Sequence, residues 1–114
     1  LHTAYRRQRQ MCIRDRIGVK RLEPFVNWLI KHNKKGHIGE FGVPAEDESG
    51  LKALDQTLAY LQQHCIPFAY WAAGPSWGKN KLSVEPIKGV DRPQWAVLQK
   101  YLGGGNCTSI GPGT

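Results

Sequence analysis

The sequence predicts an α/β fold with parallel strands, as one part of a larger sheet or barrel. Two short apolar runs, at residues 37–41 and 68–72, each lie between stretches with helical periodicity. Strands that alternate with helices pair in parallel through right-handed crossovers. Two parallel strands alone leave open edges and an uncovered apolar face, so they cannot close a core. We therefore expect these 114 residues to be a piece of a longer product, which also fits a start at Leu1 rather than Met.

The first predicted helix covers residues 17–35. Its apolar side chains recur at intervals of three and four residues, which forms one apolar face: Leu22, Phe25, Val26, Leu29 and Ile30. Pro24 suits a first helical turn. Lysines followed by Gly36 predict the end of the helix, because cations favour the negative end of the helix dipole and glycine accepts positive φ.

The second predicted helix covers residues 50–64, between the two strands. Its apolar positions alternate spacings of three and four: Leu51, Leu54, Leu58, Leu61 and Cys65. Asp47 or Ser49 could cap its N-terminus.

A loop over residues 73–90 follows the second strand, and the last helix is predicted at 92–102. Asp91 and Gln94 resemble a capping box, and Pro93 fits the first turn. Residues 103–114 are rich in Gly, Ser, Thr and Pro and predict a flexible tail. Trp28 and Trp95 lie on helices and are interpreted as packing residues.

The formal charge of +7 is concentrated at the front of the chain. Residues 1–36 hold ten Lys or Arg against two acids, whereas residues 37–114 hold six against seven. A basic arm that binds nucleic acid is one hypothesis. However, residues 1–16 contain the strings RRQRQ and MCIRDR, which resemble translated sequencing-adapter read-through. We treat this segment as artefactual or disordered and exclude it from the fold argument.

Composition also bears on membranes, disulfides and metals. No apolar run approaches the ~20 residues that span a bilayer, so no membrane partner is expected. Three cysteines are too few for a disulfide framework. Cys65 and Cys107 could pair in an oxidising compartment, and two unpaired thiols fit equally well. No CxxC or HxxxH pair suggests a metal site, and we expect no cofactor.

One carboxylate stands inside the first apolar strand. Glu40 lies in HIGEFGVP, residues 37–44, between Gly39 and Gly42. A buried unpaired charge is costly, so this Glu is expected near the strand end, facing a cleft. Trp71 lies near the end of the next strand, and chemistry in parallel α/β folds collects at the carboxyl ends of strands. A carboxylate beside an indole suits sugar cleavage, because the carboxylate stabilises the electron-poor sugar carbon while the indole packs on the ring.

HIGEFGVP, followed by YWAAGPSWG at residues 70–78 and SVEP at 83–86, resembles the C-terminal part of glycoside hydrolase family 5. The closest subfamily comprises endoglucanases (cellulases) that end in WWAAGPWWG and SMEP. The resemblance covers residues 17–102 and implies the last portion of a (β/α)8 barrel, from the helix before strand seven onward. It also implies a secreted, retaining, monomeric enzyme that acts on a β-glucan polysaccharide such as cellulose, with no nucleic-acid or membrane partner.

The resemblance assigns a role to three residues. Glu40 would be the catalytic nucleophile, Trp71 the aromatic beneath the sugar at the cleavage point, and Trp77 a contact along the glucan cleft. This sequence departs from the family at Tyr70 and Ser76, which replace the first Trp of each WW pair. Side chains alternate along a strand, so Tyr70 is expected to point away from the cleft.

The retaining mechanism needs a second carboxylate, the acid/base. The family supplies it in an Asn-Glu-Pro motif after strand four, which this sequence lacks, and Glu85 in SVEP is interpreted as structural. The chain alone is therefore expected to be inactive. The alternatives are a non-catalytic carbohydrate-binding module that uses Trp71 and Trp77, and a basic nucleic-acid-binding protein.

Overall fold

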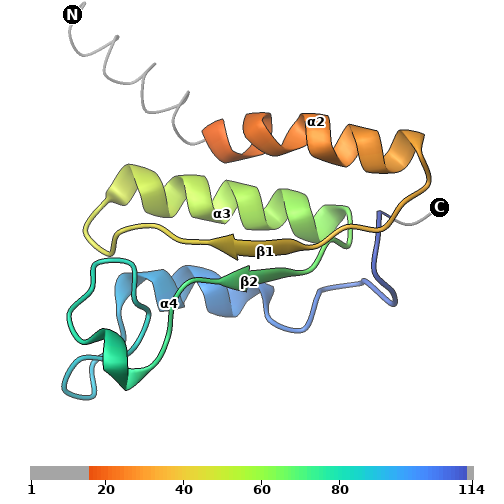
Figure 1. Cartoon of the computed structure of the whole chain (residues 1–114). Helices are drawn as coiled ribbons and strands as arrows, with labels where there is room; N and C mark the ends of the chain where they lie inside the picture. The colour runs from red at the N-terminus through yellow and green to blue at the C-terminus, as the bar shows by residue number, and fades with distance from the viewer. Residues whose placement is uncertain (1–15, 113–114) are drawn as a thin grey trace, which may run out of the picture.

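A computed structural model describes residues 16–112 and contains two parallel strands and three α-helices in those residues (Figure 1). The elements are α2 (Ile17–Lys31), β1 (Ile38–Phe41), α3 (Glu48–Gln63), β2 (Phe68–Tyr70), the 3-10 turn η1 (Pro75–Trp77), α4 (Pro93–Leu98) and the 3-10 turn η2 (Gln99–Tyr101). The predicted element order and the parallel pairing are confirmed. The prediction of an artefactual or disordered N-terminal segment falls on residues that lie, except for Arg16, outside the described part of the chain.

The helices cover one face of the two-stranded sheet. The core cluster comes from the three helices and the residue Ile66 before β2: Val26, Leu29, Leu54, Leu58, Leu61, Ile66 and Leu98. Ile38, Phe41, Phe68 and Tyr70 pack against this cluster from the strands. Gly39, Glu40 and Ala69 are exposed instead. The opposite face of the sheet is therefore open among the described residues.

β1 contains one residue more than its partner requires. Ile38 pairs with Phe68 and Phe41 pairs with Tyr70, with a register irregularity between them. Phe68 and Tyr70 are two residues apart and share a face, so Ile38 and Phe41 share that face although they are three apart. The extra residue makes a bulge, which lets Gly39 and Glu40 both be exposed. Strict alternation would have placed Glu40 on the same side as Ile38.

The first helix differs from its prediction at both ends. It begins at Ile17, so Pro24 lies inside it rather than in its first turn. It ends at Lys31. Asn33, with φ 52°, takes the left-handed conformation that was predicted for Gly36. The Lys34 amide then donates a hydrogen bond to the Leu29 carbonyl at 2.8 Å. Asn tolerates this conformation, so the helix stops earlier than the lysines suggested.

The buried face of α2 is narrower than the periodicity predicted. Val19, Val26 and Leu29 are buried, whereas Phe25, Trp28 and Ile30 are 38%, 51% and 53% exposed. The interpretation of Trp28 as a packing residue is therefore wrong for the described structure. The reason is that α3 is the helix against which α2 packs, and it covers only one side of α2.

The helix caps are confirmed for α3 and wrong for α4. Asp47 caps α3, and its carboxylate accepts a hydrogen bond from the Gly50 amide at 3.0 Å. α4 begins after Arg92 without a side-chain cap, so the capping box of Asp91 and Gln94 does not form. Gln94 is fully buried and bonds to carbonyl groups of two loops instead.

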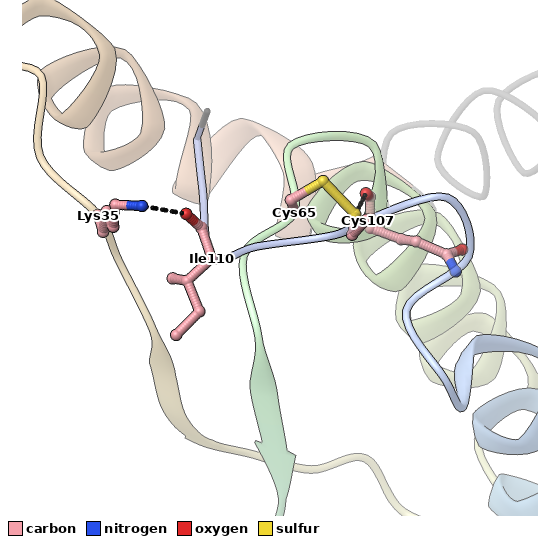
Figure 2. The surroundings of a disulfide bond; sticks show 5 residues. Lys35, Cys65, Cys107 and Ile110 are labelled. Atoms are coloured by element: carbon pink, nitrogen blue, oxygen red, sulfur yellow. Dashed lines mark hydrogen bonds between the residues drawn. A yellow bond between two sulfur atoms is a disulfide. The ribbon is translucent and has the colours of Figure 1, made fainter. Parts of the chain in front are cut away.

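The segment after η2 is tied to the amino-terminal ends of both strands (Figure 2). Cys107 forms a disulfide with Cys65, with 5.5 Å between the Cα atoms, which decides between the two alternatives that the sequence left open. Lys35 Nζ donates to the Ile110 carbonyl at 3.1 Å, and the Gly111 amide donates to the Cys65 carbonyl at 2.7 Å. The prediction of a flexible tail at 103–114 did not anticipate these contacts.

Hydrogen bonds around Asp55 join α3 to η2. The Tyr101 hydroxyl lies within hydrogen-bond distance of the Asp55 carboxylate and backbone carbonyl, and Lys100 Nζ lies 2.8 Å from the same carboxylate. Burial acts to raise the pKa of Asp55, but the hydrogen bonds from Lys100 and Tyr101 and the Lys100 charge outweigh it and lower the pKa. Burial and the Asp55 carboxylate raise the pKa of Tyr101 to about 12.

Loss of the disulfide is expected to destabilise the chain. Cys107→Ala should lower the free energy of unfolding by about 2–4 kcal/mol, because the bridge closes a loop between residues 42 apart in sequence. Denaturant unfolding of Cys107→Ala, with Ser109→Ala as the control, measures the loss. Peptide mapping without reductant should recover Cys65 joined to Cys107. Equal stability of the two variants would contradict the bridge.

Stability is expected to fall at alkaline pH through Tyr101. The unfolded phenol ionises near its ordinary pKa of 10.0, whereas the folded one ionises at about 12. The stabilisation is therefore complete below pH 10 and is lost as the pH rises to about 12. Tyr101→Phe should lose about 1 kcal/mol at neutral pH and reduce this alkaline slope. Denaturant unfolding at several pH values measures both effects. An unchanged slope in Tyr101→Phe would contradict the assignment.

Candidate active site

The carboxyl ends of the two strands lie side by side at one edge of the sheet. Both arrows point the same way in Figure 1, toward the end that carries η1. The Trp71 amide donates a hydrogen bond to the Phe41 carbonyl at 2.7 Å, which places Trp71 beside the residue that follows Glu40. We use the term rim for this edge of the sheet, which carries Glu40, Gly42, Trp71 and η1. Two of the three residues predicted to form a site, Glu40 and Trp71, therefore lie on the same rim.

Gly42 permits this close approach. A Cβ atom at Gly42 would collide with the backbone carbonyl oxygen of Trp71. A backbone atom cannot swing away as a side chain can, so any larger residue would force the strand ends apart. Gly39 differs, because a Cβ there would meet only the His37 ring, at 4.0 Å.

Trp71 and Trp77 form a pair of indoles on the rim. Their ring centroids are 4.6 Å apart and the planes meet at 61°. Trp77 is 41% exposed and Trp71 is partly buried. The short turn η1 presents Trp77, and the peptide bond between Trp71 and Ala72 is cis. An exposed apolar indole face is suited to packing against a sugar ring.

Glu85 holds the loop that carries the indoles. Its carboxylate accepts a hydrogen bond from the Gly74 amide at 2.9 Å, and its own amide donates to the Ser83 hydroxyl at 3.1 Å. The Val84 amide also donates to the Ala72 carbonyl at 2.8 Å. These contacts support the structural interpretation of Glu85.

The side chain of Glu40 is exposed on β1, and its carboxylate forms no hydrogen bond or ion pair with the part of the chain that the structure describes. It borders a cavity of about 350 Å³ between α2, β1 and α3, whose walls include Leu22, Leu54 and Phe41. A carboxylate without an internal partner can engage a ligand. No group of three or more His, Cys, Asp or Glu side chains within residues 16–112 is arranged to hold a metal ion.

Two residues of the rim were missed or misassigned from the sequence. The sequence identified Gly42 only as one of two glycines that flank Glu40, whereas in the structure it admits the Trp71 carbonyl. Gln94 was assigned to a helix cap, although its amide bonds to the loops behind the rim. No local pattern distinguishes a buried Gln from a capping Gln. Tyr70 packs against the core cluster, as its predicted orientation away from the cleft requires.

Comparisons with known proteins agree on one family. The family described as cellulase, glycosyl hydrolase family 5, matches residues 2–76. Endo-beta-1,4-glucanase A of Emericella nidulans is 32% identical over 97 residues, which are 82% of this chain and 29% of that protein. Probable endo-beta-1,4-glucanase B of Aspergillus oryzae is 36% identical over 98 residues, again 82% and 29%. The chain therefore spans less than a third of the length of these relatives.

Solved structures give the same result. An endoglucanase of Pseudomonas stutzeri, in complex with cellobiose, matches with a TM-score of 0.82 and 49% identity, over 86% of this chain and 30% of that one. An endo-beta-1,4-glucanase of Xanthomonas axonopodis pv. citri matches with a TM-score of 0.69 and 32% identity, over 74% and 28%. The predicted fold class, part of a (β/α)8 barrel, is confirmed. No helix within residues 16–112 is long and apolar enough to cross a membrane.

A comparison of Gly42, which follows β1, with Gly39, which lies within β1, tests whether the close approach requires glycine. Gly42→Ala should lower the free energy of unfolding by about 1–3 kcal/mol, because its methyl group meets a backbone carbonyl. Gly39→Ala, where the methyl group has room, should change it by less than about 0.5 kcal/mol. Denaturant unfolding of both variants measures the difference. Equal losses would show that Gly42 does not mark the close approach.

Proposed function

The chain belongs to the cellulase family, glycosyl hydrolase family 5, and from this membership we propose that it contributes to a retaining endo-β-1,4-glucanase. In this proposal residues 17–102 form the last portion of the catalytic barrel, and residues 103–114 follow it. The substrate is cellulose or a related β-glucan. The full enzyme acts as a monomer, without a nucleic-acid or membrane partner.

Glu40 is the proposed nucleophile. The observation that carries the assignment is that its carboxylate is exposed on β1, next to the residue whose carbonyl accepts the Trp71 amide. In the retaining mechanism this carboxylate attacks the anomeric carbon, and the leaving-group oxygen takes a proton from the acid/base. Water then hydrolyses the glycosyl–enzyme intermediate, with the acid/base now removing the proton from that water.

Trp71 and Trp77 are the proposed sugar-binding residues. The two indoles meet at 61°, in an edge-to-face arrangement rather than a parallel stack. Trp71 lies at the strand end nearest Glu40 and would contact the sugar at the cleavage point. Trp77, which is 41% exposed, would contact the next part of the glucan chain.

The acid/base would come from a part of the barrel outside these residues. It must lie about 5–5.5 Å from the nucleophile in a retaining enzyme. Glu85 does not suit this role, because its carboxylate is bonded to the Gly74 amide. The sequence has no Asn-Glu-Pro motif. We therefore propose that the chain alone is inactive.

Secretion is also part of the proposal. The disulfide between Cys65 and Cys107 supports it, because such bonds persist in oxidising compartments and are rare in the cytosol.

A chimaera tests the nucleophile. Joining this chain to the complementary front portion of the Pseudomonas stutzeri endoglucanase should give activity on soluble cellulose, and the chain alone should give none. Glu40→Gln in the chimaera should lower kcat by at least about 1000-fold, because the covalent step is lost. Glu46→Gln, at an exposed loop position, is the matched control. Retention of most activity by Glu40→Gln would rule out the assignment, and so would failure of azide to rescue Glu40→Ala with formation of a glycosyl azide.

The exposed indole of Trp77 also fits a non-catalytic carbohydrate-binding module. Titration of the chain alone with cello-oligosaccharides separates the two functions. Quenching of tryptophan fluorescence, together with an inactive chimaera, would favour the binding module.

A further inference from the structure

The half-buried hydroxyl group of Tyr70 lies directly behind the rim. The Tyr70 ring packs edge-on against Phe41, with the centroids 5.7 Å apart, and its hydroxyl reaches the loops that follow both strands. The hydroxyl oxygen lies 2.7 Å from the Leu82 carbonyl and 3.0 Å from the Val43 carbonyl, and it accepts from the Val43 amide at 3.4 Å. One side chain of β2 thus contacts the loop after β1 and the loop after η1.

The buried amide of Gln94 complements this hydroxyl. Its Nε2 lies 3.1 Å from the Lys81 carbonyl and 3.2 Å from the Val43 carbonyl. Tyr70 has one proton to donate and the amide has two. These three protons face four carbonyls, because the Ser83 carbonyl also lies 3.5 Å from Nε2. At the shorter distances, Tyr70 donates to Leu82 and Gln94 donates to Val43 and Lys81. Burial raises the pKa of Tyr70, so the phenol keeps the proton that it donates.

The carbonyls belong to the segments that carry the site. Val43 follows Gly42 at the end of β1, so its position is tied to that of Glu40. Residues 81–83 lead into Glu85, whose carboxylate holds the Gly74 amide at the start of the turn with Trp77. A continuous set of hydrogen bonds thus runs from the strand that bears the carboxylate to the loop that bears the indoles.

We propose that Tyr70, supported by Gln94, is a positioning residue that sets the Trp71–Trp77 pair against Glu40. The inference rests on the proposed function, because only in that function do the two indoles and the Glu40 carboxylate contact the same glucan chain. It concerns a position at which this chain departs from the WW pair that its sequence resembles. An indole N–H only donates, so a Trp at this position could not accept from the Val43 amide while donating to Leu82.

The first test is spectroscopic and uses the intact chain. The close indole pair should give an exciton couplet in circular dichroism, which Trp77→Phe should abolish. Tyr70→Phe keeps the packed ring and removes the hydroxyl, and it should reduce the couplet by about half or more, because the hydroxyl fixes the loop. Tyr101→Phe removes a hydroxyl that bonds to Asp55 on α3 and to neither of the loops at the rim. It should therefore leave the couplet unchanged. Gln94→Met should act like Tyr70→Phe, so the inference remains testable if one variant fails to fold.

The second test uses the chimaera. Tyr70→Phe should raise KM about five-fold and change kcat less than about two-fold. The hydroxyl fixes the loop with Trp77, which contacts a sugar away from the cleavage point and so binds ground state and transition state alike. Trp71, at the cleavage point, is held by the bond from its own amide to Phe41. A purely structural role would lower the melting temperature in Tyr70→Phe and Tyr101→Phe alike, with KM unchanged in both.

The two proposals fail in different ways. An unchanged couplet and an unchanged KM in Tyr70→Phe would overturn the positioning role, even if Glu40→Gln abolishes activity. An active Glu40→Gln chimaera would overturn the nucleophile, whereas the couplet would still report on Tyr70.

Discussion

The close approach of two strand ends is the constraint on which the rim depends. Gly42 admits the Trp71 carbonyl, and the Trp71 amide bonds to Phe41. These contacts fix the backbone of both strand ends within two residues of Glu40. The bulge before Phe41 completes the arrangement, because it returns Phe41 to the core while leaving Gly39 and Glu40 exposed. A single extra residue therefore resolves the conflict between a buried strand and a charged side chain.

The distribution of burial follows from the same geometry. The helices cover the face that carries Ile38, Phe41, Phe68 and Tyr70, and within residues 16–112 the other face exposes small residues and Glu40. Exposed Trp28 and Ile30 on α2 agree with a chain that spans less than a third of its relatives. Both surfaces are where the rest of such a barrel would lie.

The sequence predicted the features that depend on periodicity and could not predict those that depend on contacts between distant residues. The helix that carries Leu54, Leu58 and Leu61 follows from their spacing. The position of Glu40 near a strand end follows from the cost of burying an unpaired charge. The bulge does not, because a register irregularity leaves no mark on a strand of four residues. Gln94 shows a second limit. The sequence predicted that it would form a local helix cap, but its amide bonds instead to carbonyls as far as 51 residues away.

The rim thus combines a rigid part and an adjustable part. Glu40 lies on a strand whose backbone bonds to its neighbour, whereas Trp77 lies on a loop with little regular structure. Such a loop leaves carbonyls without backbone donors, and buried carbonyls need partners. From behind the rim, Tyr70 donates to the Leu82 carbonyl and Gln94 donates to the Val43 carbonyl, whereas the Glu85 carboxylate accepts from the Gly74 amide. These bonds explain why polar side chains enter an otherwise apolar region. Because these bonds act on the loop and leave the strand pairing intact, the position of Trp77 can change without moving the Glu40 carboxylate.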